Sequence, residues 1–414
     1  DIIKEFNVFQ PLPRNVTPLS STQDFGCEGV DLLLVCWKDR QRRKCYHLAL
    51  HIANKAPPAE ASKDRNPGET WRHMGIQASG NRSAVHKLFN LNVEPVINAG
   101  GPNTKHSGSR PWPSVMQAME LASGIFYNID ELLIEAGDHI AELIGAQAAT
   151  ITSGGSGGLV VQAAAAIARD DREKIAALPL TNGMANELII LKHHRFNYDH
   201  LYLVPGARFV EVGDEKLCTS DDVESAITDK TAGIIHLESP WVNNTDVPLP
   251  ALADIAHRHG LPILCDAASM LPPRANLKKF LDEGADLVSF SGGKAIRGPQ
   301  STGILAGTPE WIEYARLNNA PNPTVARAQK VSKEEIFGLI AAVEEFVEVD
   351  ETAETARYRE MMELVVDRIV EIPGIAVSIV HDRDHYIPLA LIRLTEEWRG
   401  PDCNELRRRL MANS

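Results

Sequence analysis

The chain has 414 residues, of which 44% are hydrophobic and 23% are charged, a composition typical of a soluble globular protein. Disorder along the whole chain is thereby excluded, and the length allows two or three domains with a sizeable core. The formal net charge of -13 repels nucleic-acid phosphates and anionic lipid, so neither is expected as a partner. The longest nearly apolar stretch, residues 159–168, is far shorter than the roughly 20 residues that cross a bilayer, so no membrane span is predicted.

The cysteines favour a reducing, cytoplasmic setting, because they are too few and too scattered for a disulfide framework. No secretory signal is visible at the start of the sequence. Cys27, Cys36 and Cys45 recur at nine-residue intervals, with His47 and His51 beyond them. The close cysteine pair of structural zinc sites is absent, so the pattern predicts free thiols and no metal.

Composition divides the chain into three parts. Residues 1–85 are rich in proline and polar residues, with one apolar run at 31–37 and a basic cluster at 38–44. This part is predicted to be a partly disordered extension, and the basic cluster is interpreted as a solvated face. Residues 86–330 alternate short β-branched runs with segments of helical period, which predicts a large α/β domain with a mainly parallel sheet. Residues 331–414 predict a smaller α+β domain.

In that smaller domain, residues 334–370 have the pattern of long helices. Two apolar runs follow, at 375–380 and 387–394, and a short helix ends near Leu410. Helices followed by a pair of strands are typical of an α+β arrangement.

The large domain contains several short apolar runs that we predict to be strands. Most of them are followed by loops rich in Gly, Ser or His. In open α/β sheets, ligands bind beyond the carboxyl ends of the strands, so these loops are where chemistry is expected. The predicted strands are 149–152, 188–191, 234–237, 262–265, 287–290 and 303–306.

A glycine-rich turn follows the first of these strands and opens an alanine-rich helix. It comprises Ser153, Gly154, Gly155 and Ser156, followed by two further glycines. Unpaired backbone N–H groups and the helix dipole at such a turn can hold a phosphate. The turn lacks the Gly-Lys-Ser/Thr of a P-loop and the ribose-binding acid of a dinucleotide site. Taken alone, it fits a purely structural turn equally well.

Asp266 and Lys294 give this turn a chemical context. Asp266 ends the apolar strand before it, and Lys294 lies 28 residues later, just past another strand, so both are expected at one edge of the sheet. A carboxylate there can keep a pyridine nitrogen protonated, and a partly desolvated lysine can form a Schiff base with an aldehyde. Phosphate cradle, acid and lysine together favour pyridoxal 5'-phosphate (PLP) over a helix cap and a solvated lysine.

These motifs resemble fold-type I PLP-dependent enzymes of the selenocysteine synthase-like group, and within it the D-glucosaminate-6-phosphate ammonia-lyases. The resemblance covers residues 96–306 and implies PLP on Lys294, a salt bridge from Asp266 to the pyridine nitrogen, and phosphate contacts at 153–156. It also implies a homodimer or higher homo-oligomer with shared active sites. Enzymes of this group carry further strands of the small domain beyond the point that matches Ser414, so we interpret the small domain of this sequence as truncated. The matching runs are VINAGG at 96–101, ATITSGGSGG at 149–158, PILCDAA at 262–268 and ADLVSFSGGK at 285–294.

Further cofactor contacts are implied by the same resemblance. His194 matches the position where such enzymes stack an imidazole on the cofactor ring, and its neighbour His193 fits that position less well. The alternative for His194 is a loop histidine bonded to backbone. Ser239, Ala268 and Ser291 are expected to line the cofactor.

Arginine is the residue best suited to bind a substrate carboxylate or phosphate, because its guanidinium group can donate two parallel hydrogen bonds. Four arginines lie in loops beside the motifs, and each could equally be a surface salt-bridge partner. Arg297 is favoured because it is close to Lys294 in the sequence. The candidates are Arg110, Arg195, Arg274 and Arg297.

The resemblance implies a lyase that acts on a small amino acid or amino-sugar acid by α,β-elimination and releases ammonia and a 2-oxo acid. Lys294 and Asp266 would serve an aminotransferase, a racemase or an aldolase equally well. The alternative within the group is selenium transfer to seryl-tRNA, which the acidic body disfavours. A non-catalytic scaffold is a further alternative, against which the presence of both Asp266 and Lys294 argues.

Overall fold

The computed structural model describes residues 35–38, 45–48, 96, 98, 101–215, 217–240, 242, 246–382 and 385–412, the first two ranges and residues 385, 411 and 412 as backbone alone. The cysteine and histidine pattern between Cys27 and His51, the basic cluster and the disorder predicted for residues 1–85 therefore lie outside the described side chains. No helix in the described ranges is long and apolar enough to cross a membrane.

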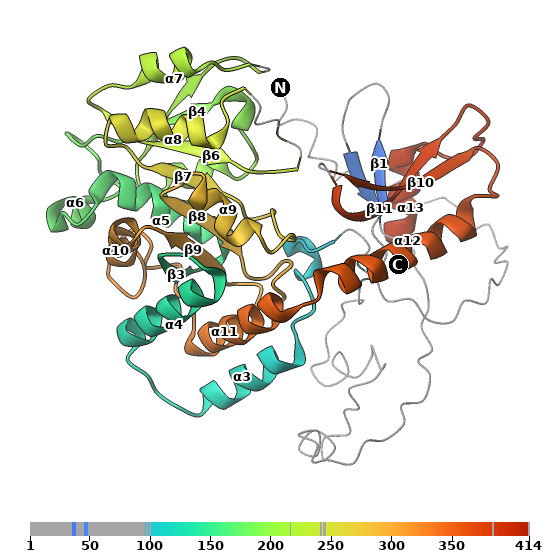
Figure 1. Ribbon diagram of the computed structural model, residues 1–414, viewed down its shortest axis with the longest axis horizontal. Helices are drawn as coiled ribbons and strands as arrows, with labels where there is room; N and C mark the ends of the chain where they lie inside the picture. The colour runs from blue at the N-terminus through green and yellow to red at the C-terminus, as the bar shows by residue number, and fades with distance from the viewer. Residues whose placement is uncertain are drawn as a thin grey trace, which may run out of the picture. The chain divides into compact units, whose positions relative to one another are not determined.

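A seven-stranded sheet forms the centre of the large domain, with the strand order β3-β9-β8-β7-β6-β4-β5. All its strands run parallel except β9, which lies antiparallel between β3 and β8. The prediction of an α/β domain with a mainly parallel sheet is confirmed (Figure 1). The strands are β3 (Ala148–Thr152), β4 (Glu187–Leu191), β5 (Arg208–Val212), β6 (Thr231–Leu237), β7 (Ile263–Asp266), β8 (Leu287–Ser291) and β9 (Gly303–Gly307).

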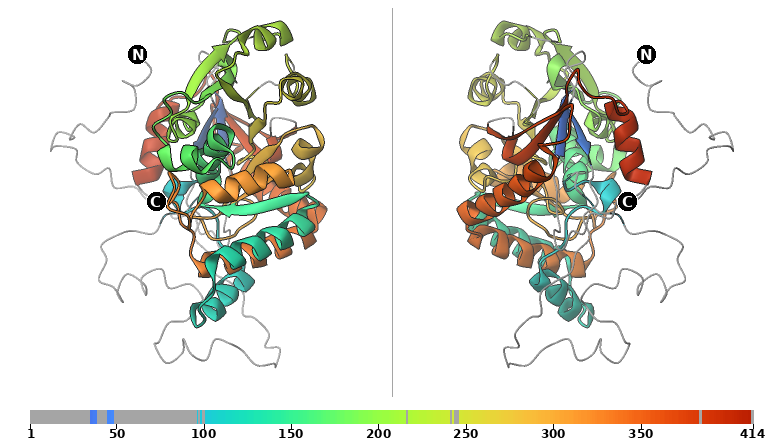
Figure 2. Two further views of the ribbon diagram at one scale, coloured as in Figure 1. Left: turned by 90° about the vertical axis from the view of Figure 1, so that its left-hand side faces the viewer. Right: turned by 90° about the vertical axis from the view of Figure 1, so that its right-hand side faces the viewer.

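Helices cover both faces of this sheet and make three layers (Figures 1 and 2). One hydrophobic cluster joins the sheet to α4 (Ile129–Ile144), α8 (Leu249–Arg258), α9 (Asn276–Asp282) and α11 (Lys333–Glu348). Another joins the opposite face to α5 (Gly154–Ala168) and α10 (Pro309–Asn318). Strands buried on both faces explain the nearly continuous apolar runs in the sequence.

Shorter elements complete the large domain. The α-helices are α3 (Pro113–Ser123), α6 (Arg172–Ala177) and α7 (Ser220–Ala226), and the 3-10 helices are η2 (Thr104–His106), η3 (Lys192–His194) and η4 (Asp199–Leu203).

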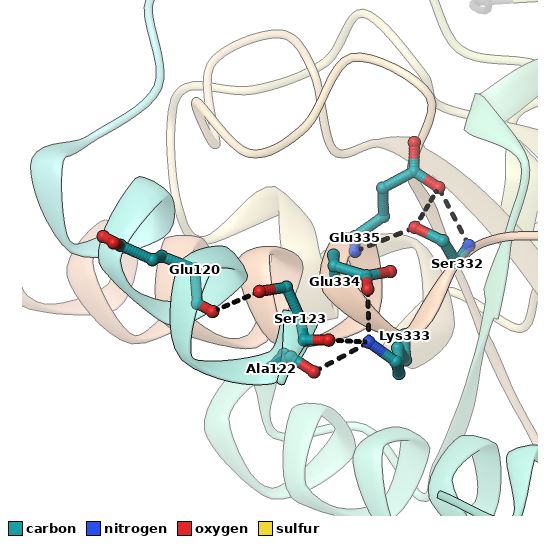
Figure 3. A network of polar contacts seen from close by, with 7 residues as sticks. All are labelled: Glu120, Ala122, Ser123, Ser332, Lys333, Glu334 and Glu335. Atoms are coloured by element: carbon teal, nitrogen blue, oxygen red, sulfur yellow. Dashed lines mark hydrogen bonds and ion pairs between the residues drawn. The ribbon is translucent and has the colours of Figure 1, made fainter. Parts of the chain in front are cut away.

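The start of α11 is tied to the end of α3 by a polar network (Figure 3). The Lys333 ammonium donates to the carbonyls of Ala122 at 2.8 Å and Ser123 at 3.1 Å. A cation at the last carbonyls of a helix satisfies orphan acceptors and opposes the negative end of the dipole. Ser332 and Glu335 form a capping box at the first turn of α11. The first turn of α11 therefore stabilises the end of α3.

The smaller domain consists of α12 (Glu351–Ile369), β10 (Ile375–Asp382), β11 (His385–Leu394) and α13 (Cys403–Ala412). The two strands match the predicted apolar runs, and α12 matches the second half of the predicted helical stretch 334–370. The first half of that stretch is α11, which packs against the large sheet and not in the smaller domain, where it was predicted. Its sheet has the order β10-β11-β1-β2, and β1 (Val35–Lys38) pairs in parallel with β11, while β2 (Cys45–Leu48) pairs antiparallel with β1. Part of the predicted extension thus belongs to the sheet of the smaller domain.

Candidate active site

Asp266 and Lys294 meet at the carboxyl edge of the large sheet. Asp266 is the last residue of β7, and its neighbour across the sheet is Ser289 of β8. Lys294 follows three residues after the end of β8. Because β7 and β8 are parallel and adjacent, their following loops start side by side, as the sequence predicts.

The burial of this pair changes its acid–base properties. Burial raises the pKa of Asp266, while the backbone N–H of Ala268, at 2.9 Å from Oδ1, and the charge of Lys294 act in the opposite direction. Burial lowers the pKa of Lys294, and the Asp266 charge opposes that effect. The lysine Nζ donates to the Ser269 hydroxyl at 2.6 Å. The site thus holds a lysine with an increased neutral fraction beside a desolvated carboxylate.

The glycine-rich turn lies against the same edge. Helix α5 begins at Gly154, with Ser153 as its N-cap residue, and the Ser153 side chain makes no capping hydrogen bond. A Cβ added to Gly155 would lie 2.9 Å from the Ala268 Cβ and 3.8 Å from the backbone nitrogen of Ser291. Only glycine allows the helix N-terminus this close to the loops after β7 and β8, so these sequence-predicted residues are brought together.

Two further contacts fix the turn. The Ser289 hydroxyl donates to the Gly155 carbonyl at 2.9 Å. Gly303 opens β9 and pairs with Thr152 of β3 and Ser291 of β8. A Cβ on Gly303 would lie 2.4 Å from the Gly154 carbonyl carbon. The backbone of β9 therefore supports the helix N-terminus directly.

His194 lies in η3, directly after β4, and is fully buried. Its Nδ1 accepts from the Leu237 backbone N–H at 3.3 Å, so the backbone bond that the sequence left open is present. The rings of His193 and His236 stand edge-on to it, with centroids 4.6 Å and 5.0 Å away. Stacking of His194 on a cofactor ring stays a prediction.

Orphaned polar groups lie at this edge of the sheet. The Ser239 hydroxyl, two residues beyond β6, is buried and has no hydrogen-bond partner among the described residues. Both ring nitrogens of His193 are likewise unpartnered within that part of the chain, and burial lowers the pKa of this imidazole. A bound cofactor with phosphate and hydroxyl groups would supply the partners that such groups require.

Two of the candidate arginines are committed to the scaffold. Arg195 donates to Asp199 at 2.5 Å and also pairs with Glu211. Arg274 donates to the Val347 carbonyl at the end of α11. Their guanidinium groups are therefore engaged by protein partners, and nothing in this geometry favours either arginine as the residue that binds the substrate's anionic group.

Arg297 has different surroundings. It adopts a left-handed backbone conformation with φ of 61°, which costs a non-glycine residue free energy and is frequent at functional sites. Its guanidinium carbon lies 3.6 Å from the centroid of the Trp112 ring, and its Nε donates to the Arg110 carbonyl at 2.9 Å. The Trp112 Nε1 donates in turn to the Ile296 carbonyl at 3.1 Å. Arg297 and Arg110 therefore lie together beside the loop that carries Lys294.

Sequence reasoning missed four residues that shape the site. Their contacts come from distant parts of the chain, and the one local signal is the position of Ser269, three residues after Asp266. The missed residues are Trp112, Ser269, Ser289 and Tyr386, whose hydroxyl donates to the Ser269 carbonyl.

These residues fit PLP on the geometry alone. A desolvated carboxylate suits the pyridine nitrogen, a lysine of lowered pKa suits the aldehyde, and an uncapped glycine-rich helix N-terminus suits the phosphate. Within the described side chains, no group of three or more His, Cys, Asp or Glu residues could hold a metal ion. The fold and the site together define a fold-type I PLP-dependent enzyme.

Comparison with known proteins specifies the family. The family model for L-seryl-tRNA selenium transferase (SelA) matches residues 140–372, and the chain belongs to this family. The D-glucosaminate-6-phosphate ammonia lyase of Salmonella typhimurium is 33% identical over 70% of this chain and 77% of the relative. The 5'-C-glycyluridine monooxygenase-decarboxylase of a Streptomyces species is 31% identical over 70% of this chain and 73% of the relative.

A solved structure supports the same relationship. The structure of a D-glucosaminate-6-phosphate ammonia-lyase has a TM-score of 0.68 and 30% sequence identity, and the match covers 81% of this chain and 88% of that one. The assignments of fold, cofactor and enzyme class made from the sequence are thereby confirmed.

Proposed function

We propose that this enzyme is a lyase that removes ammonia from an amino acid or amino-sugar acid by α,β-elimination. The observation that carries the choice among PLP reactions is the 33% identity to D-glucosaminate-6-phosphate ammonia lyase. The buried Asp266 and the half-buried Lys294, beside adjacent strand ends, supply the residues that such chemistry needs.

The geometry supports a proposal for the residues that would hold the cofactor. Asp266 would accept a hydrogen bond from the pyridine nitrogen and keep it protonated, since no other carboxylate is as deeply buried beside Lys294 among the described residues. The backbone N–H groups at Gly154–Ser156 would bind the phosphate. When bound, the cofactor supplies an aldehyde for the substrate amine and a ring that takes up an electron pair.

Lys294 is the proposed general base. Once released from the aldehyde by the substrate amine, its neutral Nζ would take the proton from Cα, and burial favours this neutral form by lowering the pKa. The same Nζ would then pass a proton to the departing β-hydroxyl, which leaves as water. The enamine product then tautomerises to an imine, whose hydrolysis consumes one water and yields the 2-oxo acid and ammonia.

Arg297 is the proposed partner of the substrate's anionic group. Its guanidinium makes no ion pair with a described carboxylate, and the Trp112 ring and the Arg110 carbonyl hold it in one orientation. A rigid, half-buried guanidinium binds carboxylate or phosphate with little loss of side-chain entropy. A phosphorylated amino-sugar acid is therefore the proposed substrate class.

Other reactions are represented among the relatives, so the test must separate them. The family name and an Aquifex aeolicus relative, 27% identical over 72% of this chain, are those of a seryl-tRNA selenium transferase. A net charge of -13 disfavours a tRNA substrate here. Transamination, racemisation and aldol cleavage would use the same Lys294 and Asp266.

The experiment compares wild type, Lys294→Ala and the exposed-lysine control Lys278→Ala. We expect PLP to give wild type and the control a visible absorbance band that Lys294→Ala lacks. D-Glucosaminate 6-phosphate should then yield equal amounts of ammonia and 2-oxo acid only with the first two proteins. A band without ammonia release would reject this substrate and redirect the search to other amino acids. A band that persists in Lys294→Ala would reject Lys294 as the cofactor lysine.

We further propose a homodimer or higher homo-oligomer in the cytoplasm. Large apolar side chains are exposed near the α3–α4 junction, with Phe126 at 98% and Leu121 at 68%, and such patches mark protein interfaces. Cys218 and Cys265 are buried free thiols, which fits a reducing compartment. Light scattering of the purified protein measures the oligomer size.

A further inference from the structure

Among the described side chains, Ser269 is the one that forms a hydrogen bond with the Lys294 amine. Its hydroxyl accepts from Nζ at 2.6 Å, across 25 residues of sequence. The serine is half-buried and lies in the loop after β7, three residues beyond Asp266. The Lys294 amine is thus bound by the loop that follows Asp266 and not by its own loop.

The loop that carries Ser269 is fixed on several sides. The Ala268 backbone N–H donates to Asp266, and the Met270 N–H donates to the Ala267 carbonyl at 3.0 Å. Asn276 of α9 holds the Met270 carbonyl at 2.7 Å. The position of the hydroxyl is therefore defined before any substrate binds.

The smaller domain supplies one more anchor. Tyr386 of β11 donates its hydroxyl hydrogen to the Ser269 backbone carbonyl. Burial raises the pKa of Tyr386 to about 12, so the phenol remains a donor at physiological pH. A residue 117 positions away thus fixes the serine that holds the lysine.

We propose that Ser269 is a positioning residue: its hydroxyl accepts a hydrogen bond from the Lys294 amine once the substrate has displaced that amine from the cofactor. In this arrangement Tyr386 keeps Ser269 in place. This inference rests on the proposed function, because it requires Lys294 to carry the substrate proton. The distance between Nζ and the hydroxyl oxygen is that of a short hydrogen bond, which suits a charged donor.

The physical effect of this contact has a definite sign. An ammonium donates a stronger hydrogen bond to a hydroxyl oxygen than an amine does, so Ser269 favours the protonated lysine that exists after Cα proton removal. Asp266 is the charged group that acts on Lys294 from β7, and it too favours the ammonium. Two groups of the smaller domain contact this loop: the neutral phenol of Tyr386 donates to the Ser269 carbonyl, and the Glu351 carboxylate accepts from the Arg274 backbone N–H at 2.6 Å, five residues further along. Burial alone opposes the contributions of Ser269 and Asp266.

Removal of the hydroxyl should therefore lower the pKa of Lys294 further. The loss of a hydrogen bond to a charged group corresponds to a shift of about one pKa unit. Threonine keeps the hydroxyl and should keep the pKa. Tyr386→Phe leaves the serine in the chain but releases its carbonyl, so a smaller shift in the same direction is expected.

The first measurement uses the full-length protein without cofactor. Trinitrobenzenesulfonate reacts with neutral amines, and mass spectrometry of the Lys294 peptide gives its rate of modification at each pH. We expect Ser269→Ala to shift the midpoint down by about one unit, Ser269→Thr to match wild type, and Tyr386→Phe to lie between them. Equal midpoints in wild type, Ser269→Ala and Tyr386→Phe would overturn the inference, even if one variant folded poorly.

The second measurement uses the PLP-loaded enzyme. Ser269→Ala should keep the visible band and lose about tenfold in kcat with little change in KM, because the contact is to the base and not to bound substrate. A rise in KM with unchanged kcat would overturn the positioning role. If Lys294 were not the cofactor lysine, the Lys294→Ala variant would keep the visible PLP absorbance band. That result would refute the proposed function, whereas the Ser269 variants test only this inference.

Discussion

Replacement of Asp266 by Asn tests the electrostatic reasoning most directly, because it removes a charge and changes little else. Asp266 is 6% exposed at the end of β7. The Asn side-chain oxygen can still accept from the Ala268 N–H, which lies 2.9 Å from Asp266 Oδ1 in the wild-type protein. The amide cannot compensate a protonated pyridine, however, so the cofactor should lose the charge that lets it accept electrons.

The size of the effect follows from burial. Removing one partner of a buried, hydrogen-bonded ion pair costs about 3–5 kcal/mol, which corresponds to a fall of about 10²–10⁴ in kcat/KM. The visible band should remain, since Lys294 is unchanged. A fall of less than about tenfold would show that Asp266 does not support the pyridine charge.

In the cofactor-free protein, the same Asp266→Asn substitution should increase stability rather than impair function. The folded-state pKa of Asp266 is raised by burial, so the folded chain keeps this proton to a higher pH than the unfolded chain. Stability is therefore lost as pH rises from the ordinary Asp pKa through the raised one. Asp266→Asn removes that loss and should unfold at higher urea than wild type at neutral pH, with equal midpoints in acid. A less stable variant at neutral pH would contradict the sign.

Two further predictions concern stability, each measured by urea unfolding. Lys333→Met removes the cation from the last carbonyls of α3 and should lower the free energy of unfolding by about 1–2 kcal/mol. The control, Lys278→Met, breaks an exposed surface ion pair and should change that free energy little. Similar losses in both variants would refute the capping role of Lys333. Tyr202→Phe leaves the buried Gln162 acceptor without its donor at 3.1 Å and should also cost about 1–2 kcal/mol. The control is Tyr314→Phe, which removes a solvent-exposed hydrogen bond from a half-buried ring. An unchanged midpoint in Tyr202→Phe would show that Gln162 has found another donor.

The central strands were predictable because each is buried on both faces. Such strands must be apolar throughout, so six of the seven strands of the large sheet appear as short runs with boundaries within a few residues. β5 was missed because it lies at the sheet edge, and its sequence, Arg-Phe-Val-Glu-Val, is interrupted by charged residues. The place of β1 and β2 in the smaller sheet depends on the pairing of β1 with β11, some 350 residues away in the sequence, which no local pattern reports.

The site was predictable where chemistry depends on spacing along the chain. Asp266 and Lys294 end or follow neighbouring parallel strands, so their proximity follows from the topology. Arg195 and Arg274 looked equally suitable for binding an anion, because Glu211, which pairs with Arg195, and the Val347 carbonyl, which pairs with Arg274, come from tertiary contacts. Asp199, four residues after Arg195, was the local signal for the commitment of that arginine. Tyr386 could not be found from sequence, since its role depends on how the smaller domain contacts one loop.

The support of Gly154 by Gly303 has a consequence for how the enzyme acquires its cofactor. Since β9 runs antiparallel between β3 and β8, its first residue lies at the edge where its neighbours end. The turn proposed to bind the phosphate is thus supported by the sheet itself and is complete once the sheet has formed. Association with PLP then requires no ordering of the turn, so the phosphate meets a rigid receptor whose conformational entropy was lost during folding.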